Sequence, residues 1–217
     1  MKQILLIAVR SALVGVAIVV AYQQLPAFFD AWKTDQPAQW WAARSSGFVA
    51  QVALTMSMLF GLMISSRGLD GGVNRSTVLD HHQQWTLAAV IALVVHVLVI
   101  VTDDYSSITV AGALVPGLST ELVGPVALGA IAFWGVLLLT LSSWLRSYMS
   151  FVVWRVVHTL ALAAFVLGLV HGMTAGTDTA LPVFQVLYVG SGSAIIGATI
   201  FRFLHVARRK TAPSVVE

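Results

Sequence analysis

Four histidines have a spacing that suggests a shared chemical role. His82 and His96 lie 14 positions apart in one apolar segment, and His158 and His171 lie 13 positions apart in another. Neutral imidazole is a common metal ligand, and an ionisable side chain inside a long apolar segment indicates a functional site. Two such segments packed side by side would present two facing imidazole pairs, one near each end. Pairs of this kind at two depths can hold two stacked hemes.

The composition indicates an integral membrane protein. The chain has 217 residues, of which 58% are hydrophobic and 10% are charged, whereas soluble domains carry about 25% charged residues. The formal net charge is +3 at pH 7, but the charges stand at the edges of apolar segments, which argues against a nucleic-acid partner. Cysteine is absent, which excludes disulfides, thiolate-bound iron–sulfur clusters and thioether-attached heme.

Six apolar segments are long enough to cross about 30 Å of hydrocarbon, for which a helix needs roughly 20 residues. They are continuous rather than alternating, which predicts helices rather than barrel strands. The predicted fold is an all-α integral membrane protein, a single domain over residues 1–217 built as a six-helix bundle with a basic tail. The predicted helices lie near 3–22, 46–65, 82–101, 123–143, 151–173 and 182–201, and the tail covers 202–217. The first is interpreted as a retained anchor, because no clear cleavage site follows it.

The basic residues predict that both termini are cytoplasmic, in a multi-pass protein of the inner cell membrane. Cytoplasmic loops are enriched in lysine and arginine. The side assigned to the cytoplasm carries Lys2, Arg67, Arg75, Arg146, Arg155, Arg202, Arg208, Arg209 and Lys210, and the other side carries only Lys33 and Arg44. The opposite, extracytoplasmic side is therefore predicted to be acidic.

Helix geometry supports the first histidine pair better than the second. Fourteen residues span about 21 Å and return to within about 40° of the starting face, so His82 and His96 share a face. Using His81 instead gives an offset of about 60°, which leaves that residue open as an alternative ligand. Thirteen residues place His158 and His171 about 140° apart on an ideal helix. We therefore expect a local distortion between them, for which Gly168 is a candidate position.

The chain resembles the ferric reductase-like transmembrane domain family. The similarity covers roughly residues 80–200 and includes Trp154-Arg155-Val156-Val157-His158, the run from Leu141 to Arg146, and His171-Gly172 followed by Ala175-Gly176-Thr177-Asp178. NADPH oxidases, ferric reductases and the heme subunit of the bacterial methionine sulfoxide reductase system share this domain. These motifs resemble small bacterial members made of the membrane domain alone.

This resemblance implies two non-covalent b-type hemes with bis-histidine ligation. His82 and His158 would ligate the cytoplasmic-side heme, and His96 and His171 the outer-side heme. Arg75, Arg146 and Arg155 would lie where the inner-heme propionates emerge, although each is equally well explained as an ordinary positive-inside residue.

The implied function is a di-heme cytochrome that moves electrons from a cytoplasmic donor to an extracytoplasmic acceptor. No Gly-rich phosphate loop occurs in a strand–turn–helix context, so we expect an oxidoreductase component without its own flavin or NAD(P)H domain. The donor would be a separate flavoprotein, carrying the flavin, or quinol. Two alternatives are a single-heme anchor subunit of an extracytoplasmic reductase and a heme-free, histidine-based metal transporter. The second would favour carboxylates at membrane depth, and the predicted helices contain none.

Overall fold

The computed structural model describes residues 36–66, 74–103 and 105–211, and every regular element in these ranges is a helix. The predicted helix 3–22 and the end of the tail lie outside the described residues. The elements are α2 (Gln36–Ser66), α3 (Arg75–Thr102), α4 (Val110–Leu114), α5 (Val123–Trp144), the 3-10 helix η1 (Leu145–Tyr148), α6 (Phe151–Thr159), α7 (Ala161–Ala175) and α8 (Pro182–Thr211).

Five stretches are long and apolar enough to cross a membrane: Ala38–Ser66, Arg75–Thr102, Val123–Tyr148, Phe151–Ala175 and Pro182–Leu204. They contain the five predicted spans that fall within the described residues. Three helices are longer than predicted. Helix α2 begins at Gln36 instead of near 46, α3 begins at Arg75 instead of near 82, and α8 continues to Thr211 instead of giving way to the tail near 201. The start of α3 is capped by Asn74, whose side chain accepts a hydrogen bond from the Ser76 amide, a favourable N-cap arrangement.

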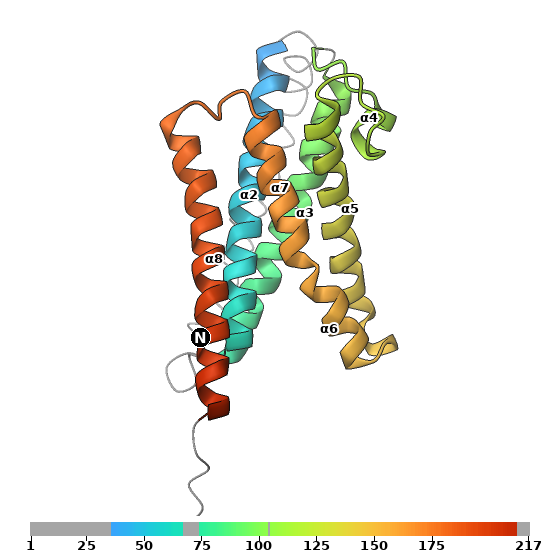
Figure 1. The fold of residues 1–217 in the computed structure, drawn as a ribbon. Helices are drawn as coiled ribbons and strands as arrows, with labels where there is room; N and C mark the ends of the chain where they lie inside the picture. Colours follow the sequence, from blue (N-terminus) through green and yellow to red (C-terminus); the bar gives the residue numbers. More distant parts are fainter. Residues whose placement is uncertain (1–35, 67–73, 104, 212–217) are drawn as a thin grey trace, which may run out of the picture.

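The helices form two antiparallel hairpins that lie against each other (Figure 1). In one hairpin α2 packs along α3, and in the other α5 packs along α6 and α7. Helix α8 runs beside α2, at the edge of the bundle opposite to α5. The short helix α4 sits in the connection between α3 and α5, where the Trp134 indole donates a hydrogen bond to the Leu114 carbonyl (2.8 Å).

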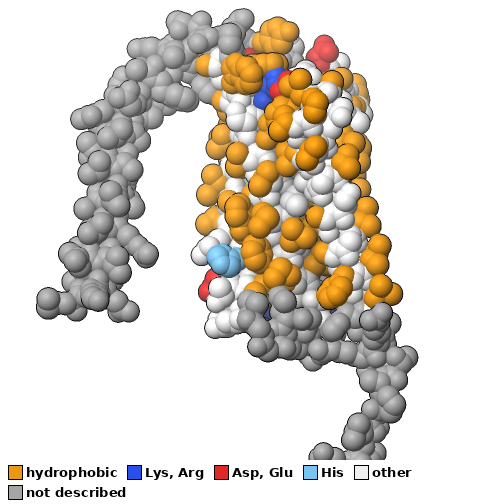
Figure 2. Space-filling model, turned by 90° about the vertical axis from the view of Figure 1, so that its left-hand side faces the viewer, with side chains coloured by type: hydrophobic (Ala, Val, Ile, Leu, Met, Phe, Trp, Pro, Cys, Tyr) orange, Lys and Arg blue, Asp and Glu red, His pale blue; other side chains and the backbone are white. Residues whose placement is uncertain are grey.

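The bundle buries small residues and exposes large apolar ones. Its most buried positions include many alanines, among them Ala50, Ala53, Ala89 and Ala130, each no more than 3% exposed. Leucine, isoleucine and valine side chains cover the surface instead, and hydrophobic side chains spread over the face shown in Figure 2. Small residues at helix contacts with large apolar residues facing outward are typical of packing in lipid, where close backbone approach drives association.

An apolar layer crosses the middle of the bundle and joins the two hairpins. Its buried centre consists of Val136 and Leu139 from α5 with Ala164 from α7. Around it pack partly buried residues from both hairpins: Leu54, Val90, Leu93, Val157 and Ala161. In sequence, its α3 members Val90 and Leu93 lie between His82 and His96, and its α7 members Ala161 and Ala164 lie between His158 and His171.

A break interrupts the fifth predicted span between His158 and His171. Helix α6 ends at Thr159 and α7 begins at Ala161. Between them, Leu160 has a ψ of −10°, and its amide donates to the Val157 carbonyl (3.0 Å), a contact one residue shorter than in an α-helix. The predicted distortion is therefore confirmed. Its suggested position was wrong, because Gly168 lies inside α7, where an added Cβ would meet only Ala132 at 3.8 Å.

Candidate metal centres

The structure brings the four candidate histidines together as two facing pairs. The ring centroids of His82 (α3) and His158 (α6) are 6.1 Å apart, with an interplanar angle of 80°. Those of His96 (α3) and His171 (α7) are 6.3 Å apart, at 76°. We name His82–His158 the inner pair, because it lies toward the end of the bundle that carries Arg75 and Arg146. His96–His171 is the outer pair.

Both separations fit two imidazoles on opposite sides of one metal ion. A metal–imidazole nitrogen bond is about 2 Å long, and the nitrogen lies about 1.1 Å from its ring centroid, so two trans ligands have centroids about 6.2 Å apart. Among the described residues, no three or more His, Cys, Asp or Glu side chains are grouped to hold a metal ion. An ion at either pair would therefore take its other ligands from elsewhere, as the iron of a heme does from the porphyrin.

Backbone carbonyls orient three of the four rings. The Nδ1 atom lies 2.8 Å from the Ser57 carbonyl oxygen in His82, 2.7 Å from that of Ala43 in His96, and 2.8 Å from that of Pro125 in His171. A carbonyl can only accept, so each of these Nδ1 atoms carries the proton. Each Nε2 atom consequently keeps its lone pair for a metal, the usual arrangement of ligating histidines.

Each of these three carbonyls stands one helical turn before a glycine. The glycines are Gly47 after Ala43, Gly61 after Ser57, and Gly129 after Pro125. A Cβ added to them would lie 3.2 Å from the His96 ring, 3.3 Å from the His82 ring and 2.6 Å from the His171 ring, respectively. The missing side chain lets the imidazole reach the carbonyl in the helix groove.

Sequence reasoning missed these glycines, although a signal for two of them was present. Gly47 and Gly61 are 14 positions apart, which is also the spacing of His82 and His96. Since α2 and α3 are antiparallel neighbours, equal spacings allow both contacts to form in one register. The Ser57 hydroxyl adds to the inner contact, lying 3.2 Å from His82 Nδ1 and 2.6 Å from the Thr86 hydroxyl.

His158 is held differently from the other three histidines. Its buried Nδ1 atom has no hydrogen-bond partner among the described residues. Instead its ring stacks on Trp154, with centroids 4.9 Å apart and an interplanar angle of 19°. The Arg146 guanidinium lies 4.6 Å from the Trp154 ring centroid, within cation–π distance. The buried Trp154 Nε1 atom also lacks a partner within the described ranges.

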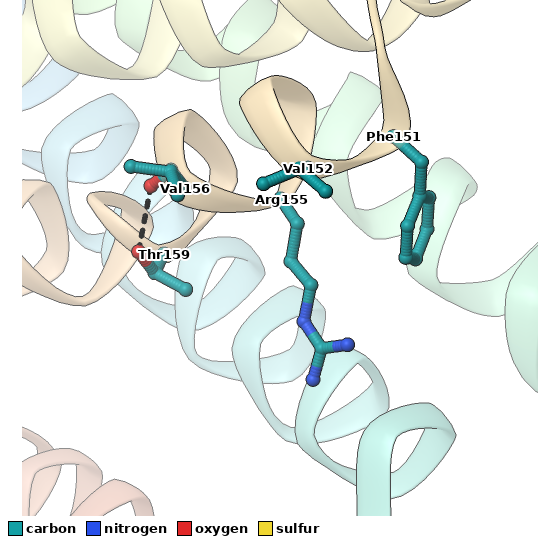
Figure 3. Close-up of a pocket in the computed structure, with 5 residues that line it drawn as sticks. All are labelled: Phe151, Val152, Arg155, Val156 and Thr159. Atoms are coloured by element: carbon teal, nitrogen blue, oxygen red, sulfur yellow. Dashed lines mark hydrogen bonds between the residues drawn. The ribbon is translucent and has the colours of Figure 1, made fainter.

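The three candidate arginines have different contacts among the described residues. Arg146 approaches the inner pair through Trp154. Arg75 donates to the Ile64 carbonyl at the end of α2 (3.1 Å). Arg155 points along an open surface pocket of about 380 Å³ on α6, which is lined by Phe151, Val152, Arg155, Val156 and Thr159 (Figure 3).

His82, rather than His81, faces His158. The His81 side chain is exposed and its ring stacks on Phe60, with centroids 5.3 Å apart. The alternative of His81 as the member of the inner pair is thus not the arrangement found in this structure.

A half-buried ion pair connects α2 to the α7–α8 loop near the outer pair. The side chains of Arg44 and Asp178 are only 12% and 17% exposed and form a salt bridge. Arg44 also lies over Trp40, 3.7 Å from the ring centroid. The contact joins the outer end of the α2–α3 hairpin to the loop that follows the hairpin of α5 with α6 and α7.

Removing one member of this ion pair is expected to destabilise the protein. Asp178→Asn leaves the half-buried Arg44 charge without its partner, a change that should cost less than the about 3–5 kcal/mol seen in fully buried pairs. Thermal unfolding in detergent should show a lower midpoint for D178N. The double variant R44Q/D178N should recover part of the loss, and a further decrease in the double variant would contradict this reading.

No protein-family model matches the chain, and no curated protein or solved structure matches it. The assignment of a function therefore rests on the geometry of the two pairs and on the sequence.

Proposed function

We propose that the protein is a di-heme b-type cytochrome that moves electrons across the membrane, as ferric reductase-like proteins do. The observation that carries this proposal is the pairing of four histidines at separations of 6.1 and 6.3 Å, both close to the value for trans imidazole ligands. A heme bound at each pair would supply one-electron chemistry between Fe(III) and Fe(II). An iron held by both histidines of a pair would have no open position for oxygen, which would favour electron transfer.

The rest of the chain supports this role through its own side chains. Carbonyl-bound Nδ1 atoms hold three imidazoles in the metal-binding tautomer. The apolar layer around Val136, Leu139 and Ala164 joins residues of both hairpins and would help to keep water away from the two centres. The helices that carry the pairs are long enough to cross the bilayer, so the two centres would lie in series across it.

The distribution of charged residues between the two ends of the bundle suggests the direction of electron transfer. The inner end carries Arg75, Arg146 and Arg155, and the outer end carries Asp103, Glu121 and Asp178. Under the positive-inside rule the first end is cytoplasmic. Electrons would thus be supplied at the inner pair by a separate flavoprotein or quinol in the inner cell membrane, and would leave from the outer pair to an extracytoplasmic acceptor.

A single-heme anchor subunit is the second candidate, and one observation favours it. Within the described part of the chain, His158 lacks the carbonyl hydrogen bond that the other three rings make. The outer pair is therefore the pair in which both rings are oriented by such a bond. A protein that used only this site would bind one heme per chain. The number of hemes per chain therefore separates the two candidates.

Transfer across a sealed bilayer tests the proposed function. Heme-loaded protein in liposomes that contain ferricyanide should oxidise a membrane-impermeant reductant added outside. Because transfer needs both centres, the variant His96→Ala should slow this reaction at least tenfold. Equal rates for the wild-type protein and for protein-free liposomes would contradict transmembrane electron transfer.

A further inference from the structure

The two pairs differ in how many of their rings are bonded to a carbonyl. In the outer pair, both His96 and His171 donate through Nδ1 to a backbone oxygen. In the inner pair, His82 does so, whereas His158 has no such bond to any described residue and is packed against Trp154. A hydrogen bond from Nδ1 to an acceptor makes an imidazole a stronger electron donor to its metal, which stabilises the oxidised iron. The outer pair is therefore the stronger donor set.

Arg146 and Asp103 add to this difference between the pairs, and Arg44, the cation near the outer pair, is paired with Asp178. Arg146 lies 4.6 Å from the Trp154 ring that stacks on His158. On the outer side, the side chain of Asp103 is 5% exposed, and this residue caps the C-terminal end of α3 seven positions after His96. A cation near a metal favours the reduced form, which has one positive charge less, and a carboxylate favours the oxidised form.

We propose that Arg146, Trp154 and His158 form a tuning unit that keeps the inner centre at a higher midpoint potential than the outer centre. Arg146 and Trp154 are positioning residues in this unit, because they act on the metal through His158. The inference rests on the proposed function, since it presumes a heme at each pair. A single electron added to the protein would therefore reside mainly at the inner centre. This is the centre on the side of the proposed cytoplasmic donor.

A redox titration followed by optical spectroscopy tests the order of the potentials. The wild-type protein should give two waves, and His82→Ala, which removes the inner centre, should abolish the wave at higher potential. Loss of the lower wave in H82A would overturn the inference. A wild-type protein that binds no heme would instead contradict the proposed function itself, so the two failures are distinguishable.

Two arginine variants test the role of the stack. Arg146→Gln should move the inner wave to lower potential and leave the outer wave in place. Arg155→Gln is the matched control, because it removes the same charge from the same end of the bundle but from a side chain that lies along the surface pocket. Equal shifts in R146Q and R155Q would overturn the role of Arg146.

Substitutions of Trp154 separate stacking from general stability. Trp154→Phe keeps an aromatic face against His158 and should retain the inner wave. Trp154→Leu removes the aromatic face and should shift or abolish the inner wave, while the outer wave stays unchanged. An unchanged inner wave in W154L would show that the stack does not position His158.

Discussion

Gly129→Ala is expected to remove the outer heme and to spare the inner one. A Cβ at this position would lie 2.6 Å from Nδ1 and 2.7 Å from Cε1 of His171, closer than such atoms can approach. The ring must then leave the Pro125 carbonyl that fixes its orientation. Loss of an orienting contact of this kind weakens metal binding by about 10–100-fold. Heme content and the low-spin optical spectrum of the purified variant measure the effect.

The other glycines provide a graded series and a control. Gly47→Ala and Gly61→Ala bring a Cβ to 3.2 Å from the His96 ring and 3.3 Å from the His82 ring. They should therefore weaken the outer and inner centres, respectively, by less than Gly129→Ala. Gly124 lies on the same helix as Gly129, and nothing is within 4 Å of its added Cβ. If G124A lost heme to the same extent as G129A, the steric explanation would be wrong.

Replacing single histidines should remove one centre at a time. His96→Ala or His171→Ala should reduce the heme content from two per chain to one and leave the inner spectrum intact. His82→Ala or His158→Ala should also reduce the heme content to one per chain, but should leave the spectrum of the outer heme intact. The reason is that each pair shares one metal, so either loss leaves a single axial ligand. Heme-to-protein ratios together with the assignment of the two redox waves provide the measurement.

His81 offers a control for this series. It is the sequence neighbour of His82, but its exposed ring stacks on Phe60 instead of facing His158. We expect His81→Ala to retain both centres. If H81A lost the inner heme and H82A kept it, the ligand assignment at the inner pair would have to be exchanged.

Much of the fold could be predicted from hydropathy, but the helix ends could not. The apolar cores of the five described spans were placed correctly because lipid selects continuous apolar stretches. Helix α2 starts at Gln36 and includes Trp40, Trp41 and Arg44, residues that belong to the interface rather than to the hydrocarbon. A helix continues through such a region as long as its backbone hydrogen bonds are made. Hydropathy therefore underestimates its length.

The candidate site was partly accessible from the sequence. The spacing of His82 and His96 indicated one shared helix face, and these residues do line up opposite His158 and His171. The contributions of α2 and α5 were not accessible, because a glycine or a carbonyl acquires its role only from the ring that packs against it. The position of the helix break was missed for a related reason: Gly168 is conformationally free but packs normally, whereas Leu160 carries the short contact to Val157.

The number of hemes bound per chain, with the ligation of each iron, tests the central claim most directly. The measurement combines a pyridine hemochrome assay with electron paramagnetic resonance on full-length protein produced with an adequate heme supply. The proposed function predicts two b-type hemes per chain, both low-spin with two imidazole ligands. A preparation that is folded and helical but contains no heme would contradict it.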